Sequence, residues 1–95
     1  MRIIGGKWKI LILWHLNKGV LRFAELRRNL PGISKKVLTE ALRELEEYQI
    51  INRKIYADIP PKVEYSITDL GKSLIPALNI LAEWGEKRSE LNKKK

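Results

Sequence analysis

The sequence predicts a mainly helical domain that carries one small β-hairpin, a fold of the α+β class. Apolar residues recur at three- and four-residue intervals in four separate segments, which is the spacing of one helix face. Between the third and fourth segments, two short runs of β-forming residues flank a Pro-Pro pair, as in a hairpin. The chain has 95 residues, enough for one core, so a single domain over residues 1–95 is expected.

The first helix is expected to begin after Gly6 and to end before Lys18. The apolar run over residues 10–14 is also compatible with a buried strand, but the spacing on either side of it favours a helix. The residues with helical spacing are Trp8, Leu11, Ile12 and Leu16. Residues 20–22 are too few for more than an edge strand.

A two-turn helix over residues 23–30 is expected to stop at Pro31-Gly32, because Pro has no amide proton to donate and Gly relaxes the backbone. After a tight turn, Ser34 is suited to cap a third helix over residues 34–48, since its hydroxyl can accept from a first-turn amide. The residues expected to face inward from this helix are Leu38, Ala41, Leu42 and Leu45.

Residues 51–56 and 62–67 are the expected hairpin strands, with a stiff tip between them. Thr68 is expected to cap a last helix that begins near Asp69, and Pro76 is expected to bend this helix rather than end it. Its apolar stripe consists of Leu70, Leu74, Ala77, Leu78, Leu81, Trp84 and Leu91.

Lys and Arg number 19 against 11 acidic residues, which gives a formal net charge of +8. An excess of this size attracts polyanions, so nucleic acid is the leading partner class, ahead of anionic membranes and acidic proteins. No run approaches the roughly 20 apolar residues of a membrane span, and the N-terminal apolar run is too short for a signal peptide. A cytoplasmic protein without membrane contact is therefore expected.

Catalytic and metal-binding patterns find little support in the sequence. The chain has no Cys and a single His, so it can form neither a disulfide, nor a thiolate metal site, nor a His-based triad within one chain. No Gly-rich loop suited to cradle a phosphate is present either. The sequence therefore predicts a protein that is not an enzyme, with no cofactor and no metal.

The predicted order is helix, short strand, helix, tight turn, helix, hairpin, helix, which is the layout of a winged helix-turn-helix. Such a fold presents its third helix so that the outer face can enter a DNA major groove about 12 Å wide. Residues 18–68 would form the helix-turn-helix and wing, residues 1–17 and 69–92 the core and dimerisation helices, and residues 93–95 a tail.

One stripe of the third helix carries Lys36, Thr39 and Arg43, with Lys35 one position away and Ser34 at the cap. Two cations and a hydroxyl suit guanine acceptors, phosphates or a thymine methyl group. Acidic residues farther along the helix indicate that only its N-terminal half enters the groove. The alternative is that the basic face merely solvates a core helix.

Other cations are candidates for contacts with the DNA backbone. Arg53, Lys54 and Lys62 bracket the hairpin tip and could reach phosphates or a minor groove, although Lys residues also solvate exposed edge strands. Arg22, Arg27 and Arg28 fit phosphate contacts or plain surface positions equally well.

The apolar stripe of the last helix is longer than one small domain can cover with its own core, so a second copy is expected to pack on it. The residues expected at this homodimer interface are Ile3, Ile4, Leu78, Leu81, Trp84 and Leu91. A two-fold dimer would set its third helices about 34 Å apart, one turn of duplex, and would favour a near-palindromic site.

Several blocks of the chain resemble the HxlR-type winged helix-turn-helix regulators, in the same order. They are residues 4–8 (IGGKW), 22–26 (RFAEL), 32–39 (GISKKVLT), 42–46 (LRELE), 59–71 (IPPKVEYSITDLG), 74–78 (LIPAL) and 84–85 (WG). The resemblance implies a winged-helix dimer that represses or activates nearby genes by binding operator DNA. It also implies that residues 34–43 belong to the recognition helix and residues 53–62 to the wing.

The chain departs from this family in two places. It has no Cys, whereas some members sense oxidants through one, so thiol sensing is not expected. Gln49 stands where a Gly usually ends the recognition helix, and a left-handed residue there would cost about 1 kcal/mol in a non-Gly side chain.

The leading hypothesis is a sequence-specific regulator that binds double-stranded DNA as a homodimer, with residues 34–48 in the major groove and residues 51–67 on the backbone or minor groove. The alternative is a winged-helix module that binds an acidic protein. The sequence specifies neither an effector, nor an operator, nor the direction of regulation.

Overall fold

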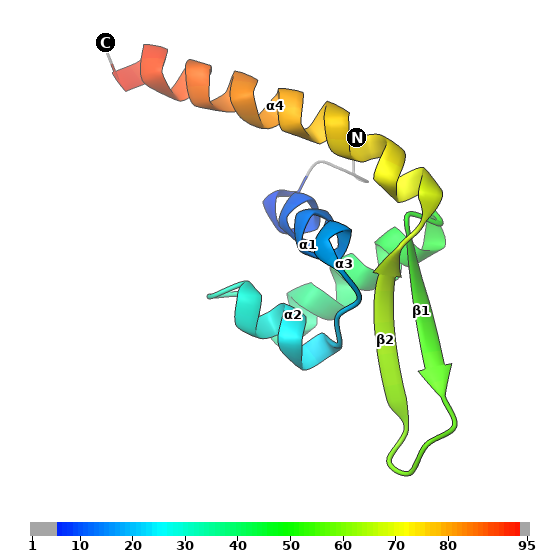
Figure 1. The fold of residues 1–95 in the computed structure, drawn as a ribbon. Coiled ribbons are helices and arrows are strands. Elements are labelled where there is room, and N and C mark those ends of the chain that lie inside the picture. The colour runs from blue at the N-terminus through cyan, green and yellow to red at the C-terminus, as the bar shows by residue number, and fades with distance from the viewer. Residues whose placement is uncertain (1–5, 94–95) are drawn as a thin grey trace.

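The computed structural model describes residues 6–93 of the chain, with side chains described through residue 85. The elements follow the predicted order, and they confirm the four helices and the hairpin (Figure 1). They are α1 (Lys7–Lys18), α2 (Phe23–Asn29), α3 (Lys35–Glu47), β1 (Ile51–Tyr56), β2 (Lys62–Ile67) and α4 (Asp69–Lys93). The helix predicted over residues 23–30 ends one residue earlier, because Leu30 already leaves the helical conformation.

α1 is the central element, since it contacts α2, α3, α4 and β2. Ile12, Leu13 and Leu16 are buried on it, whereas Trp8 and Leu11 pack at the edge of the core and are only partly buried. The core is completed by buried residues of the other elements and of the connections between them, which are Leu26, Leu30, Ile33, Leu38, Ala41, Leu42, Leu45, Ile50, Ile51, Tyr65 and Leu78.

α3 begins and ends with defined hydrogen bonds. The Ser34 hydroxyl accepts from the Val37 amide at 3.1 Å, which confirms the predicted cap. At the other end Gln49 has φ 60°, so this residue, which stands where the family usually has a Gly, adopts the left-handed conformation. The Ile50 amide donates to the Leu45 carbonyl at 2.9 Å and the Gln49 amide to the Glu46 carbonyl at 2.9 Å, which is a Schellman arrangement.

The hairpin strands are antiparallel, with Ile51 opposite Ile67 at the base and Tyr56 opposite Lys62 near the tip. Both boundaries agree with the sequence prediction. The short edge strand predicted over residues 20–22 is reduced to one bridge, in which Leu21 and Tyr65 exchange hydrogen bonds of 3.1 and 2.8 Å. The hairpin begins beside the first turn of α4, and its tip points away from that helix (Figure 1).

A close contact joins the end of α3 to the start of α4. The Ile50 carbonyl accepts from the Thr68 amide at 3.0 Å, and the Thr68 hydroxyl accepts from the Gly71 amide at 3.0 Å, as expected of a cap. The same hydroxyl lies 2.7 Å from the Gln49 carbonyl and 2.9 Å from the Ile50 carbonyl. Gly71 packs so tightly here that a Cβ on it would lie 2.3 Å from the Ile50 carbonyl oxygen.

α4 continues through Pro76 and is only partly covered by the rest of the chain. Leu78 is 1% exposed in the core, so its side chain is not available to a second copy and the expected dimer contact at Leu78 is wrong. Leu81 and Trp84 are exposed, as the dimer hypothesis requires. Ile3 and Ile4, and the side chain of Leu91, lie outside the described part of the chain.

Gly71→Ala is expected to lower the free energy of unfolding by about 3 kcal/mol, because the added methyl group would overlap a backbone oxygen in a packed joint. Gly85→Ala is the matched control on the same helix, where no atom lies within 4 Å of the added Cβ. There the better helix propensity of Ala should raise stability by up to about 1 kcal/mol. Urea unfolding followed by Trp fluorescence measures both, and equal stability of the two variants would contradict the packing argument.

Candidate nucleic-acid interface

The outer face of α3 is exposed from its cap at Ser34 as far as Arg43. Lys35, Lys36 and Arg43 are all exposed, and none of them forms an ion pair with another described residue. Ser34 is exposed as well, and because its oxygen accepts from the Val37 amide, its own proton stays available for donation. This face therefore presents three cations and one hydroxyl donor to solvent.

Thr39 is exposed between these cations, but its hydroxyl is already engaged. The hydroxyl donates to the Lys35 carbonyl within the helix at 2.7 Å. An acceptor lone pair and the methyl group remain, so Thr39 is better suited to contact a thymine methyl group or to accept a hydrogen bond than to donate one. Thr39 also borders two hollows, one on each side of α3, so the helix forms a ridge between them.

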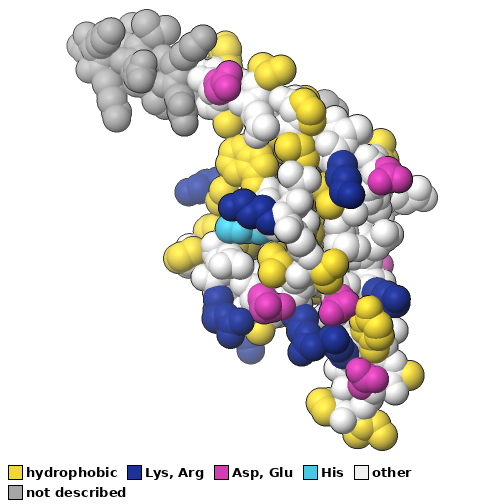
Figure 2. Space-filling view, viewed as in Figure 1, with side chains coloured by type: hydrophobic (Ala, Val, Ile, Leu, Met, Phe, Trp, Pro, Cys, Tyr) yellow, Lys and Arg dark blue, Asp and Glu magenta, His cyan; other side chains and the backbone are white. Residues whose placement is uncertain are grey.

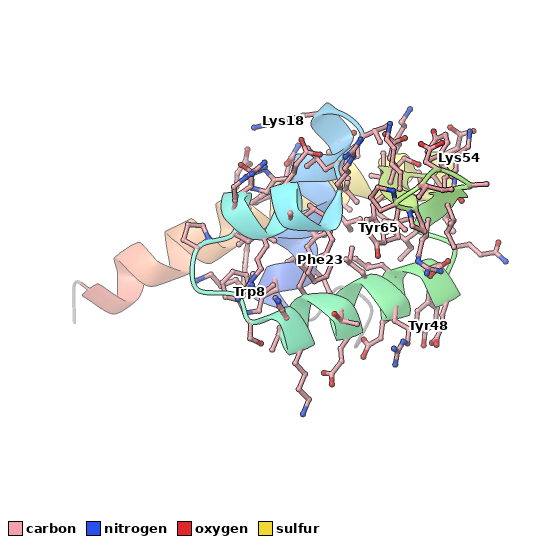
Figure 3. All side chains as sticks on the ribbon, turned by 90° about the horizontal axis from the view of Figure 1, so that it is seen from below. Trp8, Lys18, Phe23, Tyr48, Lys54 and Tyr65 are labelled. Atoms are coloured by element: carbon pink, nitrogen blue, oxygen red, sulfur yellow. The ribbon has the colours of Figure 1, made fainter. Side chains whose placement is uncertain are left out.

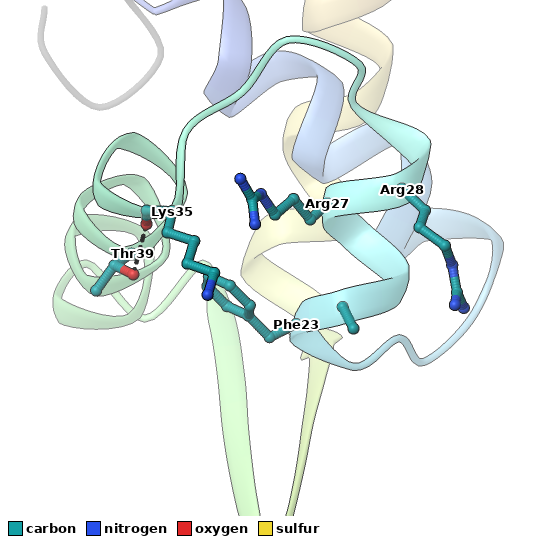
Figure 4. Close-up of a pocket in the computed structure, with 6 residues that line it drawn as sticks. Phe23, Arg27, Arg28, Lys35 and Thr39 are labelled. Carbon is teal, nitrogen blue, oxygen red and sulfur yellow. Dashed lines mark hydrogen bonds between the residues drawn. The ribbon is translucent and has the colours of Figure 1, made fainter.

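The first hollow is an open groove of about 770 Å³ between α2 and α3. Lys35 extends from α3 toward Phe23, and Arg27 extends from α2 into the space between the two helices (Figure 4). Arg28 borders the groove, but its side chain is directed away from α3. The sequence offered no signal to separate Arg27 from Arg28, because both lie on the exposed surface of a short helix.

The second hollow, of about 250 Å³, lies between α3 and the hairpin. Its lining consists of Thr39, Leu42, Arg43, Glu46, Arg53 and Tyr65. Arg53 lies directly opposite Tyr65 across the two strands, so both side chains are on the hairpin face that meets α3. Figure 3 shows Tyr65 at this position, between the hairpin and α3. Tyr65 was not among the predicted site residues, because a Tyr in a strand indicates core packing as readily as binding.

The other face of the hairpin carries a separate charged cluster. Lys54 and Glu64 lie directly opposite each other, and the ammonium groups of Lys54 and Lys62 lie 4.9 and 5.1 Å from the centre of the Tyr56 ring. Successive residues of a strand point to opposite faces, which is why Lys54 and Arg53 do not share a surface. The predicted wing cations therefore divide between two faces.

Lys62 forms an ion pair with a described residue, whereas Lys54 forms none. Its ammonium group lies 3.5 Å from the Glu64 carboxylate, and the Tyr56 hydroxyl donates to that carboxylate at 2.8 Å. The hydrogen bond from Tyr56 holds the pKa of Glu64 below its ordinary value, and the charge of Lys62 acts in the same direction. Glu64 consequently stays ionised and offsets the charge that Lys62 would offer to a polyanion.

Two acidic residues near the basic face, Glu44 and Glu25, have partners of their own. Glu44 forms an ion pair with Lys9 of α1, on the side of α3 that meets the core. The Glu25 carboxylate accepts from the Arg22 backbone amide at 2.9 Å, at the start of α2. The Arg22 side chain is exposed, as is that of Arg28. In Figure 2, Lys and Arg side chains gather over α2 and the upper part of the hairpin, whereas apolar side chains cover its tip.

The described residues contain no group of three or more His, Asp or Glu side chains that could hold a metal ion. None of the described helices is long and apolar enough to cross a bilayer. The exposed cations and the two hollows are thus the features that bear on binding.

The sequence matches the family described as HxlR-like helix-turn-helix over residues 3–93. It is 53% identical over 83 residues to an uncharacterized HTH-type transcriptional regulator of Methanothermobacter thermautotrophicus, and the match covers 87% of the chain and 63% of that relative. It is 52% identical over 83 residues to the HTH-type transcriptional regulator YkvN of Bacillus subtilis, covering 87% of the chain and 70% of YkvN. The chain thus spans somewhat less than two thirds of the archaeal relative.

The fold is similar to that of the redox regulator HypR in its reduced form, with a TM-score of 0.87 and 42% identity over 99% of the chain and 93% of HypR. These relatives are regulators and not enzymes, in agreement with the prediction from the sequence. From its sequence match and its winged-helix fold together, the chain belongs to the HxlR-like helix-turn-helix family.

Proposed function

We propose that the protein is a transcription regulator that binds specific double-stranded DNA sequences as a homodimer. The observation that carries this proposal is the division of α3 into two faces. Leu38, Ala41, Leu42 and Leu45 are buried, while Ser34, Lys35, Lys36, Thr39 and Arg43 are exposed. The buried face fixes the helix to the body, and the exposed face is left to enter a major groove.

The two hollows support this orientation. A helix in a major groove has a sugar-phosphate strand on each side, and each strand needs room and positive charge beside the helix. The groove on the α2 side is lined by Arg27 and Lys35, and the hollow on the hairpin side is lined by Arg53 of the hairpin, with Arg43 of α3 at its other edge. The ridge of α3 between them would then read base edges through Lys36, Thr39 and Arg43.

Lys54 supplies the wing contact in this proposal. It is exposed on the hairpin and has no ion pair among the described residues, whereas Lys62 is paired with Glu64. Lys54 would contact the phosphate backbone or the minor groove beside the recognition helix. The names of the relatives, which are HTH-type transcriptional regulators, support the same activity for this chain.

Homodimerisation is supported by the exposed apolar residues of α4. Ile80 is 66% exposed, Leu81 47% and Trp84 58%, in a part of the helix that runs beyond the body of the molecule (Figure 1). Apolar side chains that are neighbours on one helix gain from burial against a second copy, at roughly 25 cal/mol per Å² of apolar surface. A two-fold axis at α4 would place two recognition helices on one side of a near-palindromic duplex.

Duplex binding is the first test of the proposal. The protein is expected to retard a duplex selected from a random pool, with an affinity that falls by a factor of about 10³ between 50 and 200 mM salt, because several phosphate contacts release counterions. A gel-shift series with competitor DNA measures this. If no duplex is retarded even at low salt, the proposal is wrong, and the alternative of a module that binds an acidic protein gains support.

The roles of α3 and the wing can be separated by two alanine substitutions of exposed cations. Arg43→Ala should weaken the selected duplex about tenfold and random duplex much less, because a base contact discriminates by roughly 1–3 kcal/mol. Lys54→Ala should weaken both duplexes alike, since a phosphate contact carries no sequence information. Competitive fluorescence anisotropy measures the affinity of each variant for each duplex, relative to the wild type. Equal losses on both duplexes from both variants would contradict the assignment.

Multi-angle light scattering tests the dimer. The wild-type protein is expected to be a dimer at micromolar concentration, and Leu81→Glu should make it a monomer, because a charge would be buried in an apolar contact. Val20→Glu is the control, since Val20 is 54% exposed and lies away from α4, between α1 and α2. A monomeric wild type, or a dimer that Leu81→Glu leaves intact, would place the interface elsewhere or remove it.

A further inference from the structure

The hollow between α3 and the hairpin contains a polar group that the fold does not use. Tyr65 is 9% exposed and belongs to the hydrophobic core, in which β2 contacts α1. Its backbone is bonded to Leu21, but its hydroxyl forms no hydrogen bond with any described residue, although it borders the hollow. The hydroxyl is not among the fully buried polar atoms that lack a partner, so it is open to solvent on the side of the hollow. The core accounts for the ring, and the hydroxyl is left available to donate a hydrogen bond to a molecule in the hollow.

The charges around the hollow define what could bind there. Arg53, directly opposite Tyr65 on the hairpin, and Arg43, on the α3 side, both border it, and neither forms an ion pair with a described residue. Glu46 is the single carboxylate of the lining. Two guanidinium groups against one carboxylate leave an excess of one positive charge, which matches the single negative charge of a phosphodiester.

The position of the hollow favours DNA as the source of that phosphodiester. Thr39 and Arg43 border the hollow and also belong to the exposed face of α3, so the hollow is continuous with the proposed base-reading surface. A backbone strand that runs beside α3 on the wing side has to pass this point. We propose that the hollow binds one backbone phosphodiester of the duplex, with the Tyr65 hydroxyl and the Arg53 guanidinium donating to its oxygens. This inference rests on the proposed function and adds a neutral donor to it.

Tyr65→Phe removes only the hydroxyl and keeps the ring that packs in the core. The affinity for the selected duplex is expected to fall about tenfold, because a hydrogen bond to a charged group is lost. The slope of affinity against salt should not change, since no cation is removed, and the unfolding midpoint in urea should stay that of the wild type. Arg53→Met should in contrast lower that slope by about one phosphate contact.

Tyr56→Phe is the matched control on the same hairpin. The Tyr56 hydroxyl already donates to Glu64, on the face opposite to Tyr65, so its removal should leave the affinity for DNA unchanged. A similar loss from both Tyr substitutions would point to a general effect on the hairpin and would overturn the assignment.

Duplexes that carry one methylphosphonate, a neutral phosphate analogue, identify the contact directly. The wild type should lose affinity when the analogue replaces the phosphate beside the wing, and Tyr65→Phe should lose nothing further at that one position while losing the usual amount at others. This non-additivity is a double-mutant cycle across the interface. Additive losses at every position would show that the hydroxyl touches no phosphate.

The outcomes also separate this inference from the proposed function. A wild type that binds duplex with the expected salt dependence, together with a Tyr65→Phe variant of equal affinity, would overturn the phosphate site alone. A wild type that binds no duplex would overturn both. Inorganic phosphate that binds the hollow without changing the affinity for the duplex, compared with chloride at equal ionic strength, would assign the hollow to a free anion instead of DNA.

Discussion

The fold depends on the joint at which α3, the base of the hairpin and the start of α4 meet. One carbonyl, that of Ile50, accepts from the Thr68 amide, and Gly71 lies against it without a side chain in between. The contact is possible only because a Cβ is missing there. It fixes the direction of α4 relative to α3, and so relates the exposed apolar residues at one end of the molecule to the basic face at the other.

Local chemistry made much of this fold predictable. Short local sequence patterns with a single physical explanation predict the Ser34 and Thr68 caps. Patterns of the same kind predict the inward residues of α3 and both hairpin strands. The position of Leu78 was not predictable in the same way. Helical spacing tells which residues share a face, but not which part of that face the rest of the chain covers, so Leu78 is buried while Leu81 and Ile80 beyond it are exposed.

The sequence predicted candidate site residues only where their exposure follows from the apolar pattern of the helix. Lys35, Lys36, Thr39 and Arg43 lie on the outer face of α3 as expected, because the apolar stripe fixes what remains outside. The state of Lys62 depends on a carboxylate two residues away and on a ring from the other strand, and the environment of Tyr65 depends on α3. Such relations arise from the register of the hairpin and its packing, which composition does not encode.

The left-handed Gln49 has a consequence for how the molecule would engage a duplex. Only residues 48–50 separate α3 from β1, and all three amides there donate to carbonyls in the last turn of the helix. So short and well-bonded a connection restricts movement of the hairpin relative to α3. In the proposed complex, the spacing between the two elements would therefore be set by the protein and would fix how far apart along the DNA their contacts lie.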